Sequence, residues 1–443
     1  MTPSARDTAR SLHDRITGRE AKVGIIGLGY VGVPLALTFV EAGYSVLGFD
    51  VDPAKIEQLN SGGSYIGHVD ATRVRAARDA GALEATTDTS RLDEADAILI
   101  CVPTPLDAAQ EPEMSYVRQS AEAIAATLRP GQLVVLESTT YPGTCQELLR
   151  PILETSRLHL GEDFFLAYSP EREDPGNPDF GTRTIPKVVG GVDTVSGDLA
   201  QALYEQAVVE VVRVSNAATA EATKLLENIF RAVNIALVNE LKLVFESMDI
   251  DIWEVLDAAS TKPFGFMRFN PGPGWGGHCI PIDPFYLTWK AKQHGITPRF
   301  IELAGKVNVE MPRHVVQRVR QALGEETNLA GRRILILGLA YKPDVADPRE
   351  SPAFEIFSLL AADGADVDYH DPYFPTAPRM RSWSDLPEKT SIELNASTLA
   401  SYDALVLVTD HSDVDYNLIL QHARLIVDTR GTLPVEHKNV VRA

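Results

Sequence analysis

The sequence predicts an α/β protein in which two doubly wound, Rossmann-like domains are joined by a long central helix and a helical dimerisation region. Three observations support this prediction. A strand, a glycine turn, a helix and a second strand follow one another over residues 22–50, and a similar order returns over residues 332–371. Between them, residues 216–248 form one helical pattern without proline or glycine. The 443 residues suffice for two or three hydrophobic cores.

The first domain opens with a pattern typical of dinucleotide-binding proteins. The buried-strand run 22–27 leads into Gly27-Leu-Gly29-Tyr30-Val31-Gly32, a helical pattern follows, and the next strand ends in Asp50. Glycines permit a tight turn and a close approach of a pyrophosphate to the helix N-terminus. Asp50 would accept hydrogen bonds from ribose hydroxyls and repel a 2′-phosphate, which predicts NAD over NADP, with Lys55 as a nearby contact. The alternative is a glycine-rich turn in another kind of α/β sheet.

Two further strands of this domain end in groups that suit a ligand. Residues 97–102 run into Pro103-Thr104-Pro105, and residues 132–137 run into Ser138-Thr139-Thr140. Because ligands of parallel sheets lie beyond the carboxyl ends of the strands, we expect these hydroxyls to reach a nicotinamide or a substrate. The alternative is that they cap helices.

Two loops carry candidate catalytic groups. The loop 168–177 gathers charge around glycine and proline, and its Glu171 is a candidate general acid or base, the alternative being a solvated surface carboxylate. The stretch 271–284 places four glycines before Cys279 and puts Asp283 four residues after it. Prolines at 281 and 284 suit the opening of a helix, where the dipole would favour a reactive thiolate at Cys279. The alternative is an inert, buried cysteine in a tight turn.

The central helix is apolar around more of its girth than a surface helix needs, which predicts burial between domains or against a second subunit. Glu221, Lys224, Asn228 and Arg231 recur at helical spacing as one polar stripe. Such a stripe would be satisfied by a bound ligand. Alternatively it is a solvated face with a Glu221–Lys224 pair.

The second α/β unit echoes the first. Residues 332–342 resemble residues 22–30, and residues 365–371 resemble the second strand and its terminal acid. This copy lacks the inner glycine and has gained Lys342, so we expect it to hold a different nucleotide. A charged loop over residues 344–350 follows, and it could also form a hinge network.

The net charge and the cysteines indicate which kinds of ligand and cellular compartment suit this protein. The net charge of −20 argues against nucleic acid and anionic membranes, while a small anionic substrate needs only a few cations or backbone N–H groups. The three cysteines show no metal-binding spacing and fit a reducing cytoplasm. With no signal peptide and no apolar run of membrane length visible, we expect a cytoplasmic protein without a metal.

Together these motifs resemble the UDP-glucose/GDP-mannose dehydrogenase family from about residue 22 to 435. The resemblance rests on Gly27–Gly32, Glu137–Gly143, Ser169–Arg172, Lys224–Asn228, Gly276–Asp283 and Gly338–Asp344. The strings at 169–177, 182–187 and 262–266 are most similar to the UDP-N-acetylglucosamine 6-dehydrogenase branch, from which Asn270 and Trp275 depart.

The resemblance implies an NAD-dependent four-electron oxidation of the C6 alcohol of a UDP-sugar to a carboxylate. UDP-N-acetyl-D-glucosamine is the expected substrate, with UDP-N-acetyl-D-mannosamine or UDP-glucose as alternatives. Cys279 would hold the sugar as a thiohemiacetal and then as a thioester. Lys224 would stabilise the developing oxyanion, and Asn228 would orient the same oxygen.

The resemblance also implies roles in water and proton handling. Asp283 and Thr139, or Thr140 in its place, would hold water and relay protons, and Glu171 would act as the acid/base residue of thioester hydrolysis. The cofactor contacts that it implies, besides the glycine motif, Asp50 and Lys55, are Pro103, Thr104, Thr139 and Arg349. The substrate contacts are Glu171, Lys224, Asn228, Arg268, Phe269, Gly276, Lys342 and Arg430, the last two for a diphosphate or carboxylate.

The expected domain division follows from these assignments: a polar tail at 1–21, an NAD-binding domain at 22–212, a central helical region with the reactive cysteine at 213–312, and a UDP-binding domain at 313–443. The family resemblance also implies a homodimer through the central helices. Two other functions fit part of the pattern. A hydroxyacid dehydrogenase of the 6-phosphogluconate type would leave the second α/β unit unexplained, and a non-catalytic NAD-binding scaffold would tolerate loss of Cys279, Lys224 and Asp283.

Overall fold

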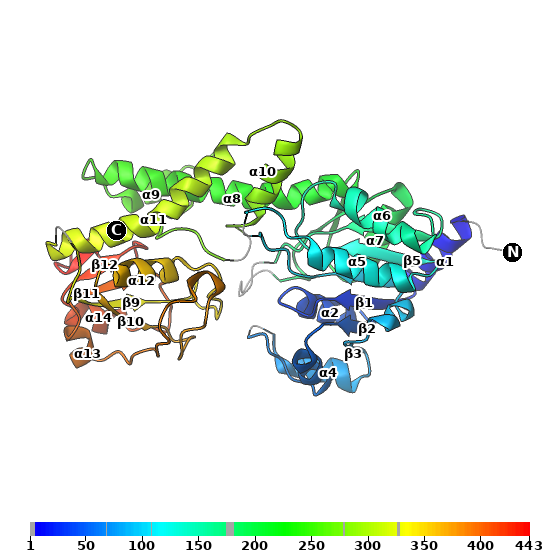
Figure 1. Cartoon of the computed structure of the whole chain (residues 1–443), viewed down its shortest axis with the longest axis horizontal. Coiled ribbons are helices and arrows are strands. Elements are labelled where there is room, and N and C mark those ends of the chain that lie inside the picture. The colour runs from blue at the N-terminus through cyan, green and yellow to red at the C-terminus, as the bar shows by residue number, and fades with distance from the viewer. Residues whose placement is uncertain (1–4, 68, 108, 174–180, 278–279, 326–327) are drawn as a thin grey trace. The chain divides into compact units, whose positions relative to one another are not determined.

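A computed structural model describes residues 5–67, 69–107, 109–173, 181–277, 280–325 and 328–443 (Figure 1). The chain forms two compact units. The first contains Met1–Glu227 together with Phe285–Gly295, and the second contains Asn228–Pro284 together with Ile296–Ala443.

The first unit is built on an eight-stranded sheet with the order β3-β2-β1-β4-β5-β6-β7-β8. Every neighbouring pair is parallel except β6 and β7. The strands are β1 (Lys22–Ile26), β2 (Ser45–Phe49), β3 (Leu83–Thr86), β4 (Ala97–Ile100), β5 (Gln132–Leu136), β6 (Phe164–Tyr168), β7 (Lys187–Gly191) and β8 (Val211–Arg213). The first six strands follow the order of a dinucleotide-binding fold, which confirms the predicted fold class.

Helices cover both faces of this sheet because successive residues of its central strands point in opposite directions. Leu99 packs in the cluster that includes α2, whereas Ile98 and Ile100 pack with α5. The helices are α1 (Ala5–Thr17), α2 (Gly32–Glu41), α3 (Pro53–Asn60), α4 (Ala71–Asp79), α5 (Ser115–Thr127), α6 (Arg150–Leu153) and α7 (Thr194–Glu205). Aspartates cap several of them: Asp52 accepts from the N–H of Ala54 at the start of α3.

The second unit contains the five-stranded parallel sheet β10-β9-β11-β12-β13, as the repeated motif predicted. Its strands are β9 (Arg333–Leu337), β10 (Asp366–His370), β11 (Ala404–Leu407), β12 (Ile426–Asp428) and β13 (Val440–Arg442). Helices α9 (Ile252–Ser260), α11 (Arg299–Leu323), α12 (Pro352–Ala362), α13 (Ala396–Ala400) and α14 (Tyr416–His422) belong to this unit. Helices α8 (Ala217–Glu246) and α10 (Asp283–Gln293) each have residues in both units.

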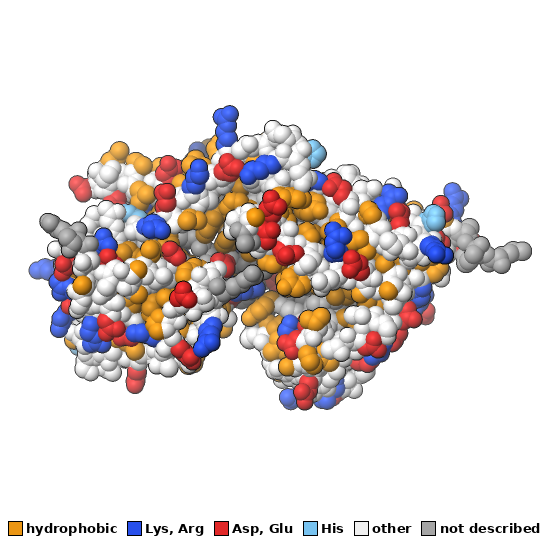
Figure 2. All heavy atoms as spheres, in the orientation of Figure 1, with side chains coloured by type: hydrophobic (Ala, Val, Ile, Leu, Met, Phe, Trp, Pro, Cys, Tyr) orange, Lys and Arg blue, Asp and Glu red, His pale blue; other side chains and the backbone are white. Residues whose placement is uncertain are grey.

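The predicted central helix is present as α8, and many of its large apolar side chains are exposed. Large apolar side chains reach solvent on α8, just after it and on α11: Phe230, Leu237, Val244, Met248, Ile250, Phe300, Leu303 and Val309. Figure 2 shows hydrophobic side chains at the surface where Figure 1 labels α8 and α11. Within the described part of the chain, no helix combines the length and apolar character needed to cross a bilayer.

Candidate active site

The glycine turn after β1 has the shape that the sequence motif requires. Gly27 has φ +94°, and a Cβ there would lie 2.5 Å from the carbonyl oxygen of Cys101. A Cβ on Gly32 would lie 1.9 Å from the oxygen of Gly27. In contrast, a Cβ on Gly29 would meet nothing within 4 Å in the described structure. The outer glycines are therefore needed for packing, while Gly29 leaves open space in front of the N-terminus of α2, beside exposed Tyr30 and half-buried Val31.

Asp50 closes the other side of this turn. Its carboxylate accepts hydrogen bonds from the backbone N–H of Leu28 at 2.9 Å and of Asp52 at 3.0 Å. Lys55 lies 3.1 Å away and forms an ion pair with it. A carboxylate held at the end of β2, next to the glycine turn, fits the ribose of a dinucleotide and disfavours a 2′-phosphate. These groups fit NAD as the sequence predicted.

The hydroxyls after β5 differ in their surroundings. Ser138 donates to the carbonyl oxygens of Ile100 and Val102, and it therefore ties two strands together. Thr139 is half-buried. Thr140 is fully buried, and its Oγ1 has no hydrogen-bond partner among the residues that the structure describes. At the end of β4, Thr104 is buried and Pro103 is exposed.

Glu171 follows β6 and is not the solvated carboxylate that the sequence left open, because only 14% of its side chain is exposed. Its Oε1 accepts from the backbone N–H groups of Arg172 and Glu173, each at 2.6 Å. Burial would raise the pKa of this carboxyl, but Lys187, these N–H groups and Lys224 together lower the pKa below its usual value. Glu171 is thus held as a carboxylate.

The polar residues of α8 divide into different roles. Glu221 is fully buried and accepts from the N–H groups of Gly143 and Cys145, so neither a ligand nor a Glu221–Lys224 pair accounts for it. Lys224 is buried, and Arg231 is exposed. The four residues lie on one helix at the predicted spacing, but the Glu221–Lys224 pair is not formed within the ranges that the structure describes, because the fold uses Glu221 to hold the loop after β5.

Asn228 meets one of the other predicted catalytic residues. Its side-chain amide donates to Asp283 Oδ2 at 2.5 Å, and both side chains are buried. Asp283 is the first residue of α10, so the helix predicted beside residues 281–284 is present. Cys279 lies outside the described residues.

The glycine-rich segment before Cys279 packs against the loop that follows β9. A Cβ on Gly276 would lie 2.9 Å from Cβ of Tyr341 and 3.0 Å from the oxygen of Glu350. Gly277, with φ +86°, donates its N–H to the oxygen of Arg349. Because side chains are excluded there by backbone and a ring, these glycines are needed to seat this segment on the loop.

The remaining predicted substrate contacts lie on the second unit. Arg268 forms an ion pair with Asp257 and donates to Asn270, and Phe269 packs edge-on against Phe230. Arg430 donates to the oxygen of Val408 and lies beside Gly272, where a Cβ would come within 3.0 Å of its guanidinium. Burial lowers the pKa of Arg430. Lys342 is half-buried. Arg349, which was predicted as a cofactor contact, pairs with Asp347 at 2.6 Å.

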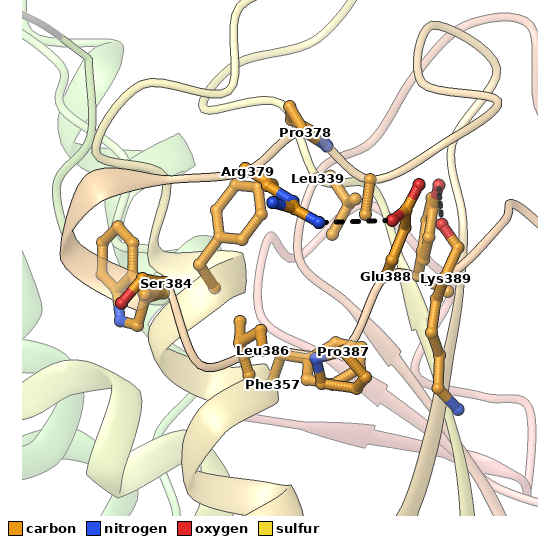
Figure 3. Close-up of a pocket in the computed structure, with 13 residues that line it drawn as sticks. Leu339, Phe357, Pro378, Arg379, Ser384, Leu386, Pro387, Glu388 and Lys389 are labelled. Carbon is orange, nitrogen blue, oxygen red and sulfur yellow. Dashed lines mark hydrogen bonds and ion pairs between the residues drawn. The ribbon is translucent and has the colours of Figure 1, made fainter.

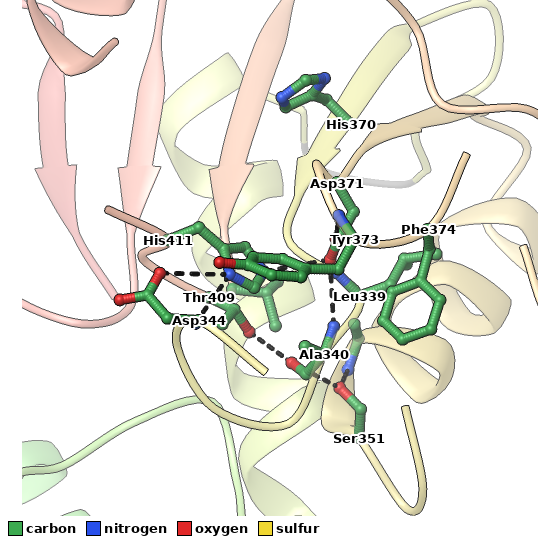
Figure 4. A network of polar contacts seen from close by, with 12 residues as sticks. Leu339, Ala340, Asp344, Ser351, His370, Asp371, Tyr373, Phe374, Thr409 and His411 are labelled. Atoms are coloured by element: carbon green, nitrogen blue, oxygen red, sulfur yellow. Dashed lines mark hydrogen bonds and ion pairs between the residues drawn. The ribbon is translucent and has the colours of Figure 1, made fainter. Parts of the chain in front are cut away.

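The second sheet also has an aspartate at the end of its second strand, as the first sheet does, but a different side chain pairs with it. Asp371 follows β10 as Asp50 follows β2, and its Oδ2 accepts from the N–H of Leu339 at 2.6 Å. The same oxygen lies 3.1 Å from Nε2 of His411, whose Nδ1 accepts from the N–H of Asp344 (Figure 4). Since Nδ1 is an acceptor, Nε2 carries the proton and donates to Asp371. Asp371 is thereby bound to a fully buried side chain, whereas Lys55 beside Asp50 is 34% exposed, and this difference supports the expectation that the second copy holds a different nucleotide.

One cavity lies apart from these residues. It has a volume of about 230 Å³ and lies between α12 and residues 377–389 in the second unit (Figure 3). Phe354, Phe357 and Trp383 line it, and Arg379 and Glu388 face each other 3.7 Å apart. None of the sequence-predicted site residues lines it. Across the described ranges, no group of three His, Cys, Asp or Glu side chains is arranged to hold a metal ion.

Sequence reasoning missed two buried residues beside Glu171. Lys187 Nζ lies 3.6 Å from Glu171 Oε2 and 2.6 Å from Glu137 Oε2. Glu137 stands at the carboxyl end of a buried parallel strand, which was a usable signal for a ligand-side residue. Lys187 carried a weaker signal, a lysine that opens an apolar strand.

Comparisons with known proteins agree with this arrangement. The NAD binding domain of the UDP-glucose/GDP-mannose dehydrogenase family matches residues 21–208, its central domain residues 218–310 and its UDP binding domain residues 335–434. The chain is 36% identical to UDP-N-acetyl-D-glucosamine 6-dehydrogenase of Pseudomonas aeruginosa over 89% of this chain and 92% of that protein. It is 33% identical to UDP-N-acetyl-D-mannosamine dehydrogenase of Pyrococcus horikoshii over 93% of this chain and 96% of that protein.

Solved structures give the same result. A UDP-D-ManNAc dehydrogenase from Pyrococcus horikoshii superposes with a TM-score of 0.84 at 30% identity, over 95% of this chain and 98% of that one. The first sheet, with its glycine turn and Asp50, therefore belongs to an oxidoreductase that uses NAD. With all three domains matched, the chain belongs to the UDP-glucose/GDP-mannose dehydrogenase family and is a nucleotide-sugar dehydrogenase.

Proposed function

We propose that this enzyme oxidises the C6 alcohol of UDP-N-acetyl-D-glucosamine to the uronate, with two molecules of NAD reduced per sugar. The proposal is supported by the relative from Pseudomonas aeruginosa that carries this name. The observation that carries the chemistry is Glu171, a buried and ionised carboxylate on the same unit as the NAD-binding turn. UDP-N-acetyl-D-mannosamine is the second candidate, because relatives from Pyrococcus horikoshii and Escherichia coli are named for that substrate.

The first half of the reaction removes a hydride from C6 and a proton from its oxygen. The glycine turn and Asp50 would hold NAD, which would supply the hydride acceptor for both oxidation steps. Lys224 stabilises negative charge as it develops on the C6 oxygen, an effect worth a few kcal/mol for one preorganised donor. Asp283 accepts the proton, and the amide of Asn228, which donates to that carboxylate, fixes its orientation.

The second half keeps the aldehyde on the protein. The thiolate of Cys279 adds to the aldehyde carbon, and the resulting thiohemiacetal loses a second hydride and becomes a thioester. Water then attacks the thioester carbonyl, Glu171 takes the proton of that water, and the thiolate leaves. Glu171 is held as a carboxylate, which is the form that can accept this proton.

We assign the threonine of this relay to Thr140 in place of Thr139. The Thr140 hydroxyl is buried and has no partner in the described structure, whereas Thr139 is half-exposed. A buried hydroxyl without a partner costs free energy, and a water or substrate oxygen that binds it would recover that cost.

Two basic residues of the second unit suit the nucleotide. Lys342 and Arg430 would bind the diphosphate. Burial lowers the pKa of Arg430 in spite of Asp410 and Asp428 nearby, so its guanidinium is incompletely solvated and would gain from an anion. Engagement of Asp371 by His411 leaves this unit unsuited to the ribose of a second dinucleotide.

We also propose a homodimer through α8 and its neighbours. Exposed Phe230, Leu237, Val244 and Met248 recur along α8 and just beyond it, as a helix that packs on a second copy requires. Light scattering should give twice the mass of the 48.4 kDa chain.

The decisive experiment is a panel of UDP-N-acetylglucosamine, UDP-N-acetylmannosamine, UDP-glucose and GDP-mannose, with NADH and consumed sugar both measured. Two NADH per UDP-N-acetylglucosamine consumed, at a higher kcat/KM than for the other three, supports the proposal. One NADH per sugar would overturn the four-electron mechanism, and a preference for the mannosamine nucleotide would overturn the substrate assignment.

A further inference from the structure

A row of three polar side chains lies buried behind Glu171 in the first unit. The Tyr204 hydroxyl, from α7, donates to Glu137 Oε1 at the end of β5. The other oxygen of Glu137 lies 2.6 Å from Lys187 Nζ, at the start of β7. Lys187 Nζ in turn lies 3.6 Å from Glu171 Oε2. The mechanism above assigns no role to the first three residues.

These groups are too deeply buried to be a surface ion pair. Only 4% of the Lys187 side chain and none of the Glu137 side chain is exposed, and Tyr204 is fully buried. A charge in such surroundings is costly unless it is paired and hydrogen-bonded. The fold places one cation between two carboxylates, so Lys187 neutralises Glu137 on one side and faces Glu171 on the other.

We propose that Lys187 is a positioning residue for Glu171, held in place by Glu137 and, behind it, by the Tyr204 hydroxyl. This inference rests on the proposed function only for the step in which Glu171 acts. Lys187 would fix the Oε2 side of the Glu171 carboxylate, while the two backbone N–H groups fix Oε1.

The electrostatics of the cluster agree with this geometry. Burial raises the pKa of Glu137 to about 7, in spite of Lys187 and Tyr204 beside it, while the pKa of Glu171 is lowered. The pKa of Lys187 is raised above its usual value, since its two carboxylates outweigh its burial. The other groups that act on this cluster are Lys224 and Glu173, and the thiol of Cys101, whose pKa burial raises.

The direction of the effect on Glu171 can be worked out. A carboxyl whose folded pKa is depressed stays ionised down to a lower pH than an ordinary glutamate, and it loses its charge as the pH falls through that depressed value. Without the cation of Lys187, burial favours the protonated form of Glu171 more strongly, and only Lys224 and the two backbone N–H groups still favour the carboxylate. Protonated Glu171 cannot accept the proton of the attacking water.

The test compares Lys187→Met with Lys187→Arg and with a matched control, Lys22→Met. Lys22 also opens a strand and pairs with a glutamate, Glu94 at 2.8 Å, but at the amino end of β1. The first readout is a ¹³C NMR titration of glutamate side chains, with the Glu171 signal identified by Glu171→Gln. This readout needs no substrate.

We expect the pKa of Glu171 to rise by at least about one unit in Lys187→Met, because a unit charge a few ångströms away in a buried site is removed. The acid limb of the kcat profile should rise by the same amount, which is at least about a tenfold loss of activity below that limb. Lys187→Arg should keep the Glu171 pKa and the acid limb of the kcat profile at their wild-type values, and Lys22→Met should change neither quantity. The KM for NAD should stay unchanged in all three variants.

An unchanged Glu171 titration in Lys187→Met overturns the proposal, as does an equal shift in Lys22→Met. Should Lys187→Met fail to fold, the wild-type titration decides: a Glu171 pKa at or above the ordinary glutamate value refutes the role of Lys187. Failure of wild-type enzyme to reduce NAD with any nucleotide sugar would refute the proposed function alone, since the NMR titration would still test the positioning of Glu171.

Discussion

Replacing Thr140 with valine should stabilise the free enzyme and impair catalysis. Thr140 is fully buried, and its Oγ1 has no hydrogen-bond partner within the described ranges of the chain. Valine has nearly the same shape as threonine but no hydroxyl, so the substitution removes the unsatisfied polar group without opening a cavity. Thr139, its neighbour, is half-exposed and provides the matched control.

The magnitude follows from the cost of burying an unpaired polar group. That cost is about 1–3 kcal/mol, so Thr140→Val should raise the free energy of unfolding of the first unit by at least about 1 kcal/mol. In a unit of this size such a gain raises Tm by about 2–4 °C. If the hydroxyl holds a water or relays a proton in the reaction, kcat should fall by about 10²-fold.

Scanning calorimetry of the free enzyme and steady-state NADH formation measure the two effects. Thr139→Val should change stability by less than about 0.5 kcal/mol, as surface substitutions usually do, and should keep most of its activity. A lower Tm for Thr140→Val would show that its hydroxyl is satisfied. Loss of activity in Thr139→Val with full activity in Thr140→Val would show that the relay uses the other threonine.

Three further substitutions test the remaining assignments. Asp50→Ala should weaken NAD binding by about 10- to 100-fold, the loss of charge-assisted hydrogen bonds, and NADP binding far less; equal losses by calorimetric titration would remove Asp50 from the ribose. Cys279→Ser should abolish steady-state NADH formation and let aldehyde-level species accumulate, as detected by mass spectrometry; full turnover would contradict the thioester route. Asp371→Asn should destabilise the second unit by about 1–3 kcal/mol, because its carboxylate accepts from Leu339 N–H and His411 and its pKa is lowered. In the wild type, the Asp371 carboxylate stabilises the fold above its unfolded-state pKa, and this stabilisation is lost as the pH falls through its depressed folded pKa. The free energy of unfolding of Asp371→Asn should therefore fall less on acidification than that of the wild type. An identical dependence of stability on pH in the two proteins would argue against the Asp371–His411 pair.

Asp50 and Asp371 show how two similar strand–turn motifs come to have different side-chain partners. Asp50 and Asp371 occupy equivalent places at strand ends, and each accepts from the backbone N–H group just past the turn glycine. Asp50 pairs with Lys55, five residues along the chain, whereas Asp371 pairs with His411, forty residues away. The hydrogen bond from the backbone N–H to each aspartate follows from the strand–turn pattern, but the side chain that pairs with the aspartate depends on which loop the fold brings close to it.

The sequence by itself determined the features that depend on neighbouring residues. The glycine turn, the acid at the end of β2, the long α8 and the repeat of the α/β unit are set by backbone sterics and by the periodicity of apolar side chains, both of which can be read locally. The sequence also predicted Glu171 as a candidate acid or base, since charge beside glycine and proline marks a loop, and it placed Asp283 four residues after Cys279.

Only the tertiary structure decided which distant groups share one environment. Lys187 and Glu137 are 50 residues apart, yet they pair at 2.6 Å, and Glu221 reaches back 76 residues to hold Cys145 N–H. Burial then sets their chemistry, because a carboxyl removed from water keeps its charge only where a cation or N–H group meets it. Contacts between such distant residues depend on the strand order and packing of the whole fold, and they cannot be read from any local stretch of sequence.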